Sequence, residues 1–239
     1  MIKVESVEVW GFEHAIRGMR NPMNSWEKSD SYMGYDCEKC GRVEREGFCE
    51  PQKHDCQEYC GIYIGPNDLA LMQKLYKAGP EHRKYLRQIF VSMDVTAPRF
   101  WWQQFDAYKV GITTDSCSTM HTIHKKEFTI DDFSCENIIV KEKIDTIIRW
   151  LNDYRDIYVN WNDSSKYMDV RGNKVEKKDV WMQMILLLPQ SYNQRRTVTM
   201  NYENVFNIIH QRSGHKLTEW TDFIGELLKL PYVKEIGGL

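Results

Sequence analysis

The sequence has no long apolar segment. Its longest apolar run, at residues 184–189, is far too short to cross a lipid bilayer, so a membrane protein is not expected. The N-terminal residues contain no basic region followed by an apolar core, which argues against a secretory signal. An excess of one charge is also missing, because 32 Lys and Arg face 34 Asp and Glu and leave a net charge of −2. Nucleic acid is therefore not the expected partner, and a cytoplasmic protein is predicted.

The sequence does have enough apolar residues for a core of ordinary size. Of its 239 residues, 42% are hydrophobic and 28% are charged, as in common soluble globular domains. No internal repeat and no low-complexity tract divides the chain. We expect one domain over residues 1–239, with an insertion at residues 27–66 that is polar and rich in cysteine.

Local patterns predict a helix-rich α+β fold with one modest sheet. Strands are expected at residues 2–10 and 88–96, because apolar residues alternate from Ile89 to Val95. Asn67 and Pro98 are each suited to a helix start, and Gly79 is suited to a helix end. Helices are expected at residues 11–20, 67–78, 98–110, 138–158, 177–188, 202–212 and 217–230.

The cysteines of the insertion form a pattern suited to a metal ion. Their ligand set is predicted to be Cys37, Cys40, Cys56 and Cys60, with Cys49 or His54 as an alternative ligand. Without a signal peptide, a reducing compartment is expected, and there two closely spaced pairs of thiolates suit a tetrahedral zinc ion. Such a closed site would stabilise the insertion and would not catalyse a reaction. The alternative is a set of free thiols in a flexible loop.

A second motif lies at residues 98–121, where an aromatic segment runs into a polar loop. The loop offers a cation at Lys109, a carboxylate at Asp115, a thiol at Cys117 and hydroxyls that include Ser118. Together these groups would suit a phosphate and a polar ring. The alternative is that the aromatic side chains form core and the loop is only solvated.

The third motif, residues 188–212, follows an apolar helix that ends at Pro189. Arg195 precedes a short β-like run at residues 197–199, and Asn201 opens a helix that carries Asn207 and Arg212. So many hydrogen-bond donors around one helix start would suit an anionic, planar ligand. The alternative is that Asn201 only caps the helix and Arg212 only complements its dipole.

The third motif resembles the C-terminal block of the flavin-dependent thymidylate synthases, the thymidylate synthase complementing (ThyX) family. Without a gap, the block reads Leu188, Pro189, Arg195, Asn201, Asn207 and Arg212. The resemblance implies that Arg212 binds the nucleotide base and favours ionisation of its ring nitrogen. It also implies that Arg195 contacts the nucleotide and that Asn201 and Asn207 contact the flavin.

The second motif resembles the signature segment of the same family, with several residues exchanged. Lys109 stands for an arginine, Asp115 for a glutamate and Cys117 for a serine, whereas Ala107, Tyr108 and Thr119 replace an arginine, a histidine and an arginine. The resemblance implies nucleotide binding by Gln104, Lys109 and Ser118, and flavin binding by Tyr108 and His82. It implies that Cys117 and Asp115 act with Arg212 in catalysis.

One basic residue of the family pattern is missing. The arginine that the family uses for the nucleotide phosphate falls on Ile185 in this chain. Arg99, Lys125 and Arg196 are candidates to replace its charge. Cys117 also permits a different idea, in which its thiolate adds to carbon 6 of the pyrimidine, although a small hydrogen-bonding spacer is the simpler interpretation.

The resemblance implies a ThyX-like α+β fold, rich in helices, with a central and mostly antiparallel sheet. It implies an FAD-dependent methylation at C5 of a pyrimidine deoxynucleotide, dUMP to dTMP or a close variant, with methylene-tetrahydrofolate and NADPH as cosubstrates. It further implies a homotetramer with shared active sites. One alternative is a non-catalytic nucleotide- or nucleic-acid-binding relative with a structural zinc lobe; the other is a purely structural, oligomerising protein.

Overall fold

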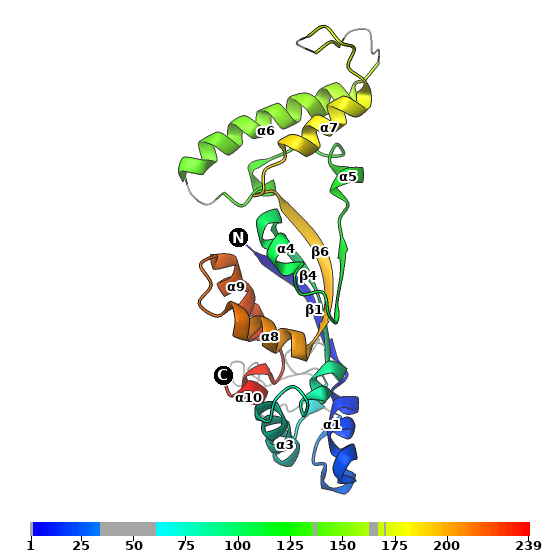
Figure 1. The fold of residues 1–239 in the computed structure, drawn as a ribbon, viewed down its shortest axis with the longest axis vertical. Coiled ribbons are helices and arrows are strands. Elements are labelled where there is room, and N and C mark those ends of the chain that lie inside the picture. Colours follow the sequence, from blue (N-terminus) through cyan, green and yellow to red (C-terminus); the bar gives the residue numbers. More distant parts are fainter. Residues whose placement is uncertain (1, 34–60, 136–137, 163–166, 170) are drawn as a thin grey trace, which may run out of the picture. The chain divides into compact units, whose positions relative to one another are not determined.

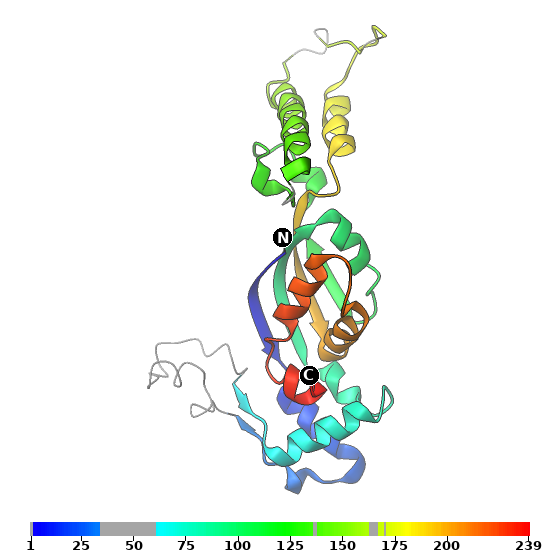
Figure 2. The ribbon, with the colours of Figure 1, turned by 90° about the vertical axis from the view of Figure 1, so that its left-hand side faces the viewer.

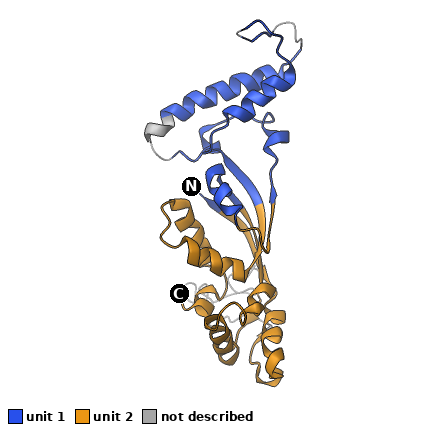
Figure 3. Ribbon diagram, viewed as in Figure 1, with its two compact units in different colours: residues 1–3, 95–107, 115–196 blue, residues 4–94, 108–114, 197–239 orange. Residues whose placement is uncertain are grey.

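The computed structural model describes residues 2–33, 61–135, 138–162, 167–169 and 171–239 (Figure 1). The chain forms two compact units, which Figure 3 shows in two colours. Unit 1 comprises residues 1–3, 95–107 and 115–196, and unit 2 comprises residues 4–94, 108–114 and 197–239. The prediction of a single domain is not tested by this division.

A four-stranded antiparallel sheet confirms the predicted fold class. Its strand order is β1 (Lys3–Trp10), β4 (Phe90–Pro98), β6 (Asn193–Asn201) and β5 (Ile112–Ser116). In unit 2 the register of β4 on β6 is visible in two side-chain bonds. Thr197 donates to Asp94 at 2.6 Å, and the hydroxyls of Ser92 and Thr199 share a hydrogen bond of 2.6 Å.

Strand β4 has the alternating burial that its sequence predicts. Val91, Met93, Val95 and Ala97 are at most 1% exposed, and the residues between them are half-buried. The terminal Pro98 is also buried. On β6, Val198 and Met200 are fully buried. The apolar face of the sheet therefore forms core, as the pattern of period two requires.

In unit 1, helices α6 (Ile138–Val159) and α7 (Lys177–Leu187) lie side by side (Figures 1 and 2). They pack around an apolar cluster whose buried members are Ile123, Phe128, Phe133, Ile144, Leu151, Met184 and Leu188. The described part of this unit also contains α4 (Arg99–Phe105), α5 (Thr119–Thr122) and the 3₁₀ turn η5 (Ile130–Asp132).

Unit 2 contains the C-terminal helices of the chain. Among the described residues, its α-helices are α1 (Phe12–Arg20), α3 (Pro66–Lys77), α8 (Tyr202–Arg212), α9 (Thr218–Leu227) and α10 (Val233–Gly237), and its 3₁₀ turns are η1 (Asn21–Met23), η2 (Trp26–Lys28) and η4 (Lys84–Gln88). A small ladder pairs β2 (Tyr32–Met33) with β3 (Ile62–Tyr63). No helix of the described residues is long and apolar enough to cross a membrane.

Some predicted element boundaries were wrong. The helix expected over residues 98–110 is only α4, Arg99–Phe105, and the expected polar loop contains the strand β5. The run at residues 197–199 is part of the longer strand β6. Asn67 is not the N-cap of α3, because Gly65 holds that position and the Asp30 carboxylate accepts from the backbone N–H groups of Asn67 and Asp68. Helix α10 was not predicted.

Candidate functional site

Two cavities are prominent among the described residues, and each lies within one unit. We call the cavity of unit 1, about 450 Å³ in volume, the Cys117 pocket. The cavity of unit 2, about 530 Å³ in volume, is the Asn207 pocket. Both volumes fall in the range of roughly 300–1,000 Å³ that is typical of small-molecule sites.

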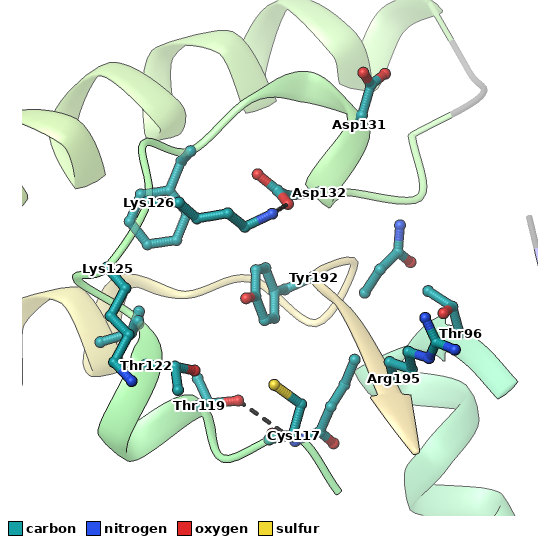
Figure 4. Close-up of a pocket in the computed structure, with 14 residues that line it drawn as sticks. Thr96, Cys117, Thr119, Thr122, Lys125, Lys126, Asp131, Asp132, Tyr192 and Arg195 are labelled. Carbon is teal, nitrogen blue, oxygen red and sulfur yellow. Dashed lines mark hydrogen bonds and ion pairs between the residues drawn. The ribbon is translucent and has the colours of Figure 1, made fainter. Parts of the chain in front are cut away.

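The Cys117 pocket forms where β5 ends and β6 begins. The Cys117 N–H donates to the Arg195 carbonyl at 3.0 Å, and the Gln194 amide donates to the Cys117 carbonyl at 3.2 Å. This pairing brings the polar segment after β5 against the first residues of β6. Figure 4 shows the Cys117 sulfur directed into the pocket. The lining residues are Thr96, Cys117, Thr119, Thr122, Ile123, Lys125, Lys126, Phe128, Asp131, Asp132, Tyr192, Asn193, Gln194 and Arg195.

Charged and hydroxyl groups dominate the polar side of the Cys117 pocket. Its lining contains three cations and two carboxylates, which leaves one net positive charge. Lys126 forms an ion pair with Asp132. Burial raises the pKa of Tyr192, and the nearby Asp132 carboxylate and Cys117 thiol raise it further. Tyr192 therefore remains a neutral hydroxyl that can donate a hydrogen bond at physiological pH.

The Asn207 pocket contains a chain of polar side chains from two arginines to α8. Glu203, in the first turn of α8, forms ion pairs with Arg83 and with Arg87. Arg83 also donates from Nη2 to the Asn207 Oδ1 at 3.3 Å. The pocket is lined by Pro80, Arg83, Arg87, Val110, Gly111, Asn201, Glu203, Asn204 and Asn207. Two arginines against one carboxylate give this pocket, too, a net positive charge.

The segment at residues 110–111 is fixed to the start of α8. Asn201 and Asn204 form a capping box, and the Asn204 Nδ2 donates to the Val110 carbonyl at 2.8 Å. Gly111 has φ +77°, and a Cβ on it would lie 2.8 Å from the Asn201 Nδ2 and 3.0 Å from the Asn204 Oδ1. Only glycine fits this close approach without strain. The fold thus brings part of the second sequence motif to the third.

Arg212 lies at the last turn of α8 between two aromatic residues of unit 2. Its Nε donates to the Tyr108 hydroxyl at 2.8 Å. Its guanidinium carbon is 4.5 Å from the Trp220 ring centroid and 5.4 Å from that of Tyr108. Both distances are within the range of cation–π attraction.

The remaining predicted site residues line neither pocket. Asp115 is exposed on β5, Lys109 is exposed in the turn before it, and Gln104 is half-buried on α4. Ser118 caps α5 by accepting from the His121 N–H. His82 is exposed, and its neighbour Arg83 enters the Asn207 pocket instead.

The candidate cations lie within the described residues, whereas the candidate metal ligands lie outside them. Lys125 lines the Cys117 pocket, whereas Arg196 pairs with Asp106 at 2.7 Å and Arg99 donates to the Leu188 carbonyl at 3.4 Å. The proposed zinc ligands Cys37, Cys40, Cys56 and Cys60, with Cys49 and His54, lie outside the described residues. Within the described ranges, no group of His, Cys, Asp or Glu could hold a metal ion.

Several pocket residues were missed from the sequence. Lys126 and Asp132 enter the Cys117 pocket from a segment that carries no motif, and Tyr192 lies in the third motif but was not singled out. Glu203 and Arg87 were missed as well, although a carboxylate in the first turn of a helix that also carries Asn207 was a usable signal. Trp220 was missed because its contact with Arg212 depends on how α9 folds back on α8.

The sheet and its flanking helices have the class of fold seen in the flavin-dependent thymidylate synthases. Among the solved structures that it resembles are two crystal structures of the enzyme ThyX from Helicobacter pylori, both with FAD and dUMP. The first has a TM-score of 0.64 at 14% identity and covers 98% of this chain and 97% of the other. The second has a TM-score of 0.63 at 14% identity and covers 99% and 97%. No protein-family model and no curated protein matches the sequence.

Proposed function

We propose that this chain is a flavin-dependent methyltransferase of the thymidylate synthase type, which acts at C5 of a pyrimidine deoxynucleotide. One observation carries the proposal. The fold matches structures of an enzyme bound to FAD and dUMP over nearly the whole chain. The motif residues support it, because Asn201 and Asn207 line one pocket while Arg195 and Cys117 line the other.

The Asn207 pocket has the chemistry to hold a flavin. The Asn201 and Asn207 side chains supply amide groups, which suit the polar edge of a flavin ring. Arg83 and Arg87 suit its phosphates, since guanidinium groups bind phosphate oxygens in pairs of parallel hydrogen bonds. Bound FAD, once reduced, would supply the hydride of the reaction. NADPH is the proposed reductant and methylene-tetrahydrofolate the proposed one-carbon donor, both by resemblance.

The Cys117 pocket is the proposed nucleotide site. Arg195, Lys125 and Lys126 offer cations for a phosphate, and the threonine hydroxyls of its lining offer further donors. Lys125 thereby stands in for the charge that is lost at Ile185. Cys117 is proposed as a hydrogen-bonding spacer beside the substrate, with Lys109, Gln104, Ser118 and Asp115 as further contacts implied by resemblance.

Arg212 lines neither pocket, and it is the proposed catalytic residue by resemblance, acting in the shared active sites of the proposed homotetramer. An arginine only donates hydrogen bonds, so at the N3–O4 edge of uracil it binds O4 and favours loss of the N3 proton, after which both atoms accept; the amino group of cytosine donates and cannot complete such a pair. A fixed cation at this edge stabilises the negative charge that develops as C5 becomes nucleophilic. Its role is the same for dUMP or a close uracil variant.

The test combines a spectrum with an assay. Purified protein should show the visible absorption of a flavin, or acquire it with FAD at micromolar affinity. It should release tritium from C5-tritiated dUMP when FAD, NADPH and methylene-tetrahydrofolate are all present. A colourless protein that does not bind FAD and releases no tritium would contradict the proposal. Sedimentation of the same sample tests the proposed homotetramer.

A second candidate function is nucleotide binding without catalysis. The exchanged residues Ala107, Tyr108 and Thr119 of the signature segment favour it, because they remove two arginines and a histidine. Binding of dUMP without tritium release, in the presence of all cosubstrates, would support this candidate over the enzyme.

A further inference from the structure

The strongest feature that the proposed function leaves unexplained is the aromatic clamp around Arg212, formed by Tyr108 and Trp220. The Tyr108 hydroxyl accepts from the Arg212 Nε at 2.8 Å, and both rings lie within cation–π distance of the guanidinium. The two rings are inclined by 66° to each other, with centroids 6.2 Å apart. They therefore restrain the guanidinium from two directions.

Each half of the clamp is itself held in place. Trp220 is fully buried and packs edge-on against Phe223, with ring centroids 6.2 Å apart. Tyr108 precedes residues 110–111, which are held at the start of α8 by the Asn204 hydrogen bond to Val110 and by the close approach of Gly111. Arg212 is carried by the same helix. Tyr108 and Arg212 are thus two side chains on one rigid frame, although they are 104 residues apart in sequence.

The geometry of the hydrogen bond restricts what the guanidinium can do. A guanidinium is planar, so a bond from Nε together with an aromatic ring close to its central carbon restricts the orientation of the whole group. An arginine held in this way loses little further rotamer freedom when it meets a ligand. Misplacement of a catalytic group by about 1 Å can lower turnover by about 100-fold. A side chain that fixes Arg212 would thus act on the rate.

We propose that Tyr108 is a positioning residue for Arg212, which orients the guanidinium that meets the pyrimidine ring. This role rests on the proposed function and differs from the flavin contact that the resemblance implied for position 108. At the position where the family has a histidine, this chain then has a tyrosine whose hydroxyl orients the catalytic arginine.

The test is Tyr108→Phe, which keeps the ring and removes the hydroxyl that accepts the bond. We expect kcat for tritium release to fall about 10- to 100-fold with little change in the KM for dUMP. Tyr108→His, which restores an acceptor atom on an aromatic ring, should recover part of the loss. Tyr32→Phe removes a tyrosine hydroxyl from an exposed residue of the same unit, and should leave kcat unchanged.

A second measurement reports on the arginine without activity. The NMR signal of the Arg212 Nε–H should exchange slowly with water in the unmodified protein, and at least about 10-fold faster in Tyr108→Phe, because a hydrogen-bonded proton is protected. Tyr108→Phe and Tyr108→His should have the same melting temperature as the parent. Exchange that stays slow in Tyr108→Phe would overturn the inference, whatever happens to kcat.

The two proposals can fail separately. If the parent turns over dUMP and Tyr108→Phe does so at the parental kcat, the positioning role is wrong and the function stands. If the parent releases no tritium, the function is wrong. The proton exchange of Arg212 then decides whether Tyr108 still positions this arginine: faster exchange in Tyr108→Phe supports the contact and unchanged exchange removes it.

Discussion

Arg195 and Arg196 are adjacent in sequence but have different surroundings. Arg195 lines the Cys117 pocket. Arg196 pairs with Asp106 at 2.7 Å, and its guanidinium carbon lies 4.3 Å from the Trp102 ring centroid. Successive residues of a strand point to opposite faces, so neighbours in sequence become a pocket residue and a packing residue.

This contrast gives a prediction for the nucleotide site. Arg195→Ala should weaken dUMP binding by about 10- to 100-fold, because a charge-assisted hydrogen bond contributes about 1.5–3 kcal/mol. FAD binding should be unaffected. Isothermal titration with each ligand measures both effects. Arg196→Ala is the matched control, and should lower the melting temperature while leaving the dUMP affinity near that of the parent. Equal losses of affinity in the two variants would contradict the assignment.

A second prediction concerns the chemical role of the Cys117 thiol. The free thiol is exposed and directed into its pocket. If it is a spacer that forms hydrogen bonds, Cys117→Ser should keep turnover within about 10-fold of the parent, since both groups donate and accept. If its thiolate adds to carbon 6 of the pyrimidine, the same variant should lose turnover almost completely. Tritium release with Cys135→Ser as control distinguishes the two roles.

At the scale of elements, the start of α3 is stabilised by residues far away in sequence. Asp68, in its first turn, is fully buried and pairs with the buried Arg20 of α1 at 2.6 Å. The hydroxyls of Ser29 and Ser31 donate to the same carboxylate, each at 2.7 Å. Burial alone would raise the pKa of Asp68, but the hydrogen bonds from Ser31 and Ser29 and the Arg20 guanidinium outweigh it and lower the pKa.

The lowered pKa predicts how stability depends on pH. A carboxyl group whose pKa is lower in the folded state stabilises the fold above its unfolded value, which is about 3.9, and loses that contribution as the pH falls through the folded pKa. The free energy of unfolding, measured in urea, should therefore fall on acidification below about pH 5. Asp68→Asn should flatten this dependence and cost about 3–5 kcal/mol at neutral pH, because Arg20 remains buried without its partner.

Asp169 is the control for this dependence. Hydrogen bonds from Asn173 and Arg171 also lower its pKa, but it is exposed in a loop. Asp169→Asn should leave the acid dependence nearly as it is in the parent. If both variants flattened the acid dependence equally, the buried Arg20–Asp68 pair would not be the source of that dependence.

The contact of residues 110–111 with α8 gives a further prediction at this scale. Gly111→Ala should destabilise the fold by about 1–3 kcal/mol and weaken FAD binding, because the new methyl group would press on Asn201 and Asn204. Gly214→Ala separates the two causes. Its φ of +73° is close to the +77° of Gly111, but nothing lies within 4 Å of its Cβ position. It should lose stability without losing FAD affinity, as urea unfolding and flavin titration would show.

At the scale of the whole molecule, the zinc site proposed for the cysteine-rich insertion rests on the sequence alone, because its ligands lie outside the described residues. We expect about one zinc ion per chain, bound by Cys37, Cys40, Cys56 and Cys60. Cys40→Ser should lower the zinc content, measured by elemental analysis, and leave the binding of FAD and dUMP unchanged because the proposed site is structural. Cys135→Ser, outside the insertion, should leave the zinc content as in the parent. Zinc-free parent protein would contradict the prediction.

Much of the fold could be predicted because its elements have strong local periodicity. The alternation from Ile89 to Val95 predicted β4, and helical spacing predicted α6 and α8. Strand β5 could not be predicted in this way. Four of its five residues are exposed, so it has no apolar face, and it exists because its backbone pairs with β6.

For the candidate site, the sequence by itself determined the residue types and their order: Arg195, Asn201, Asn207 and Arg212 stand where the resemblance needs them. The tertiary structure decided which partners they meet. Asn207 meets Arg83 across 124 residues, and Arg212 meets Tyr108 across 104 residues. The physical reason is that local periodicity acts over a few residues, whereas a side-chain hydrogen bond depends on strand register and helix packing between distant segments.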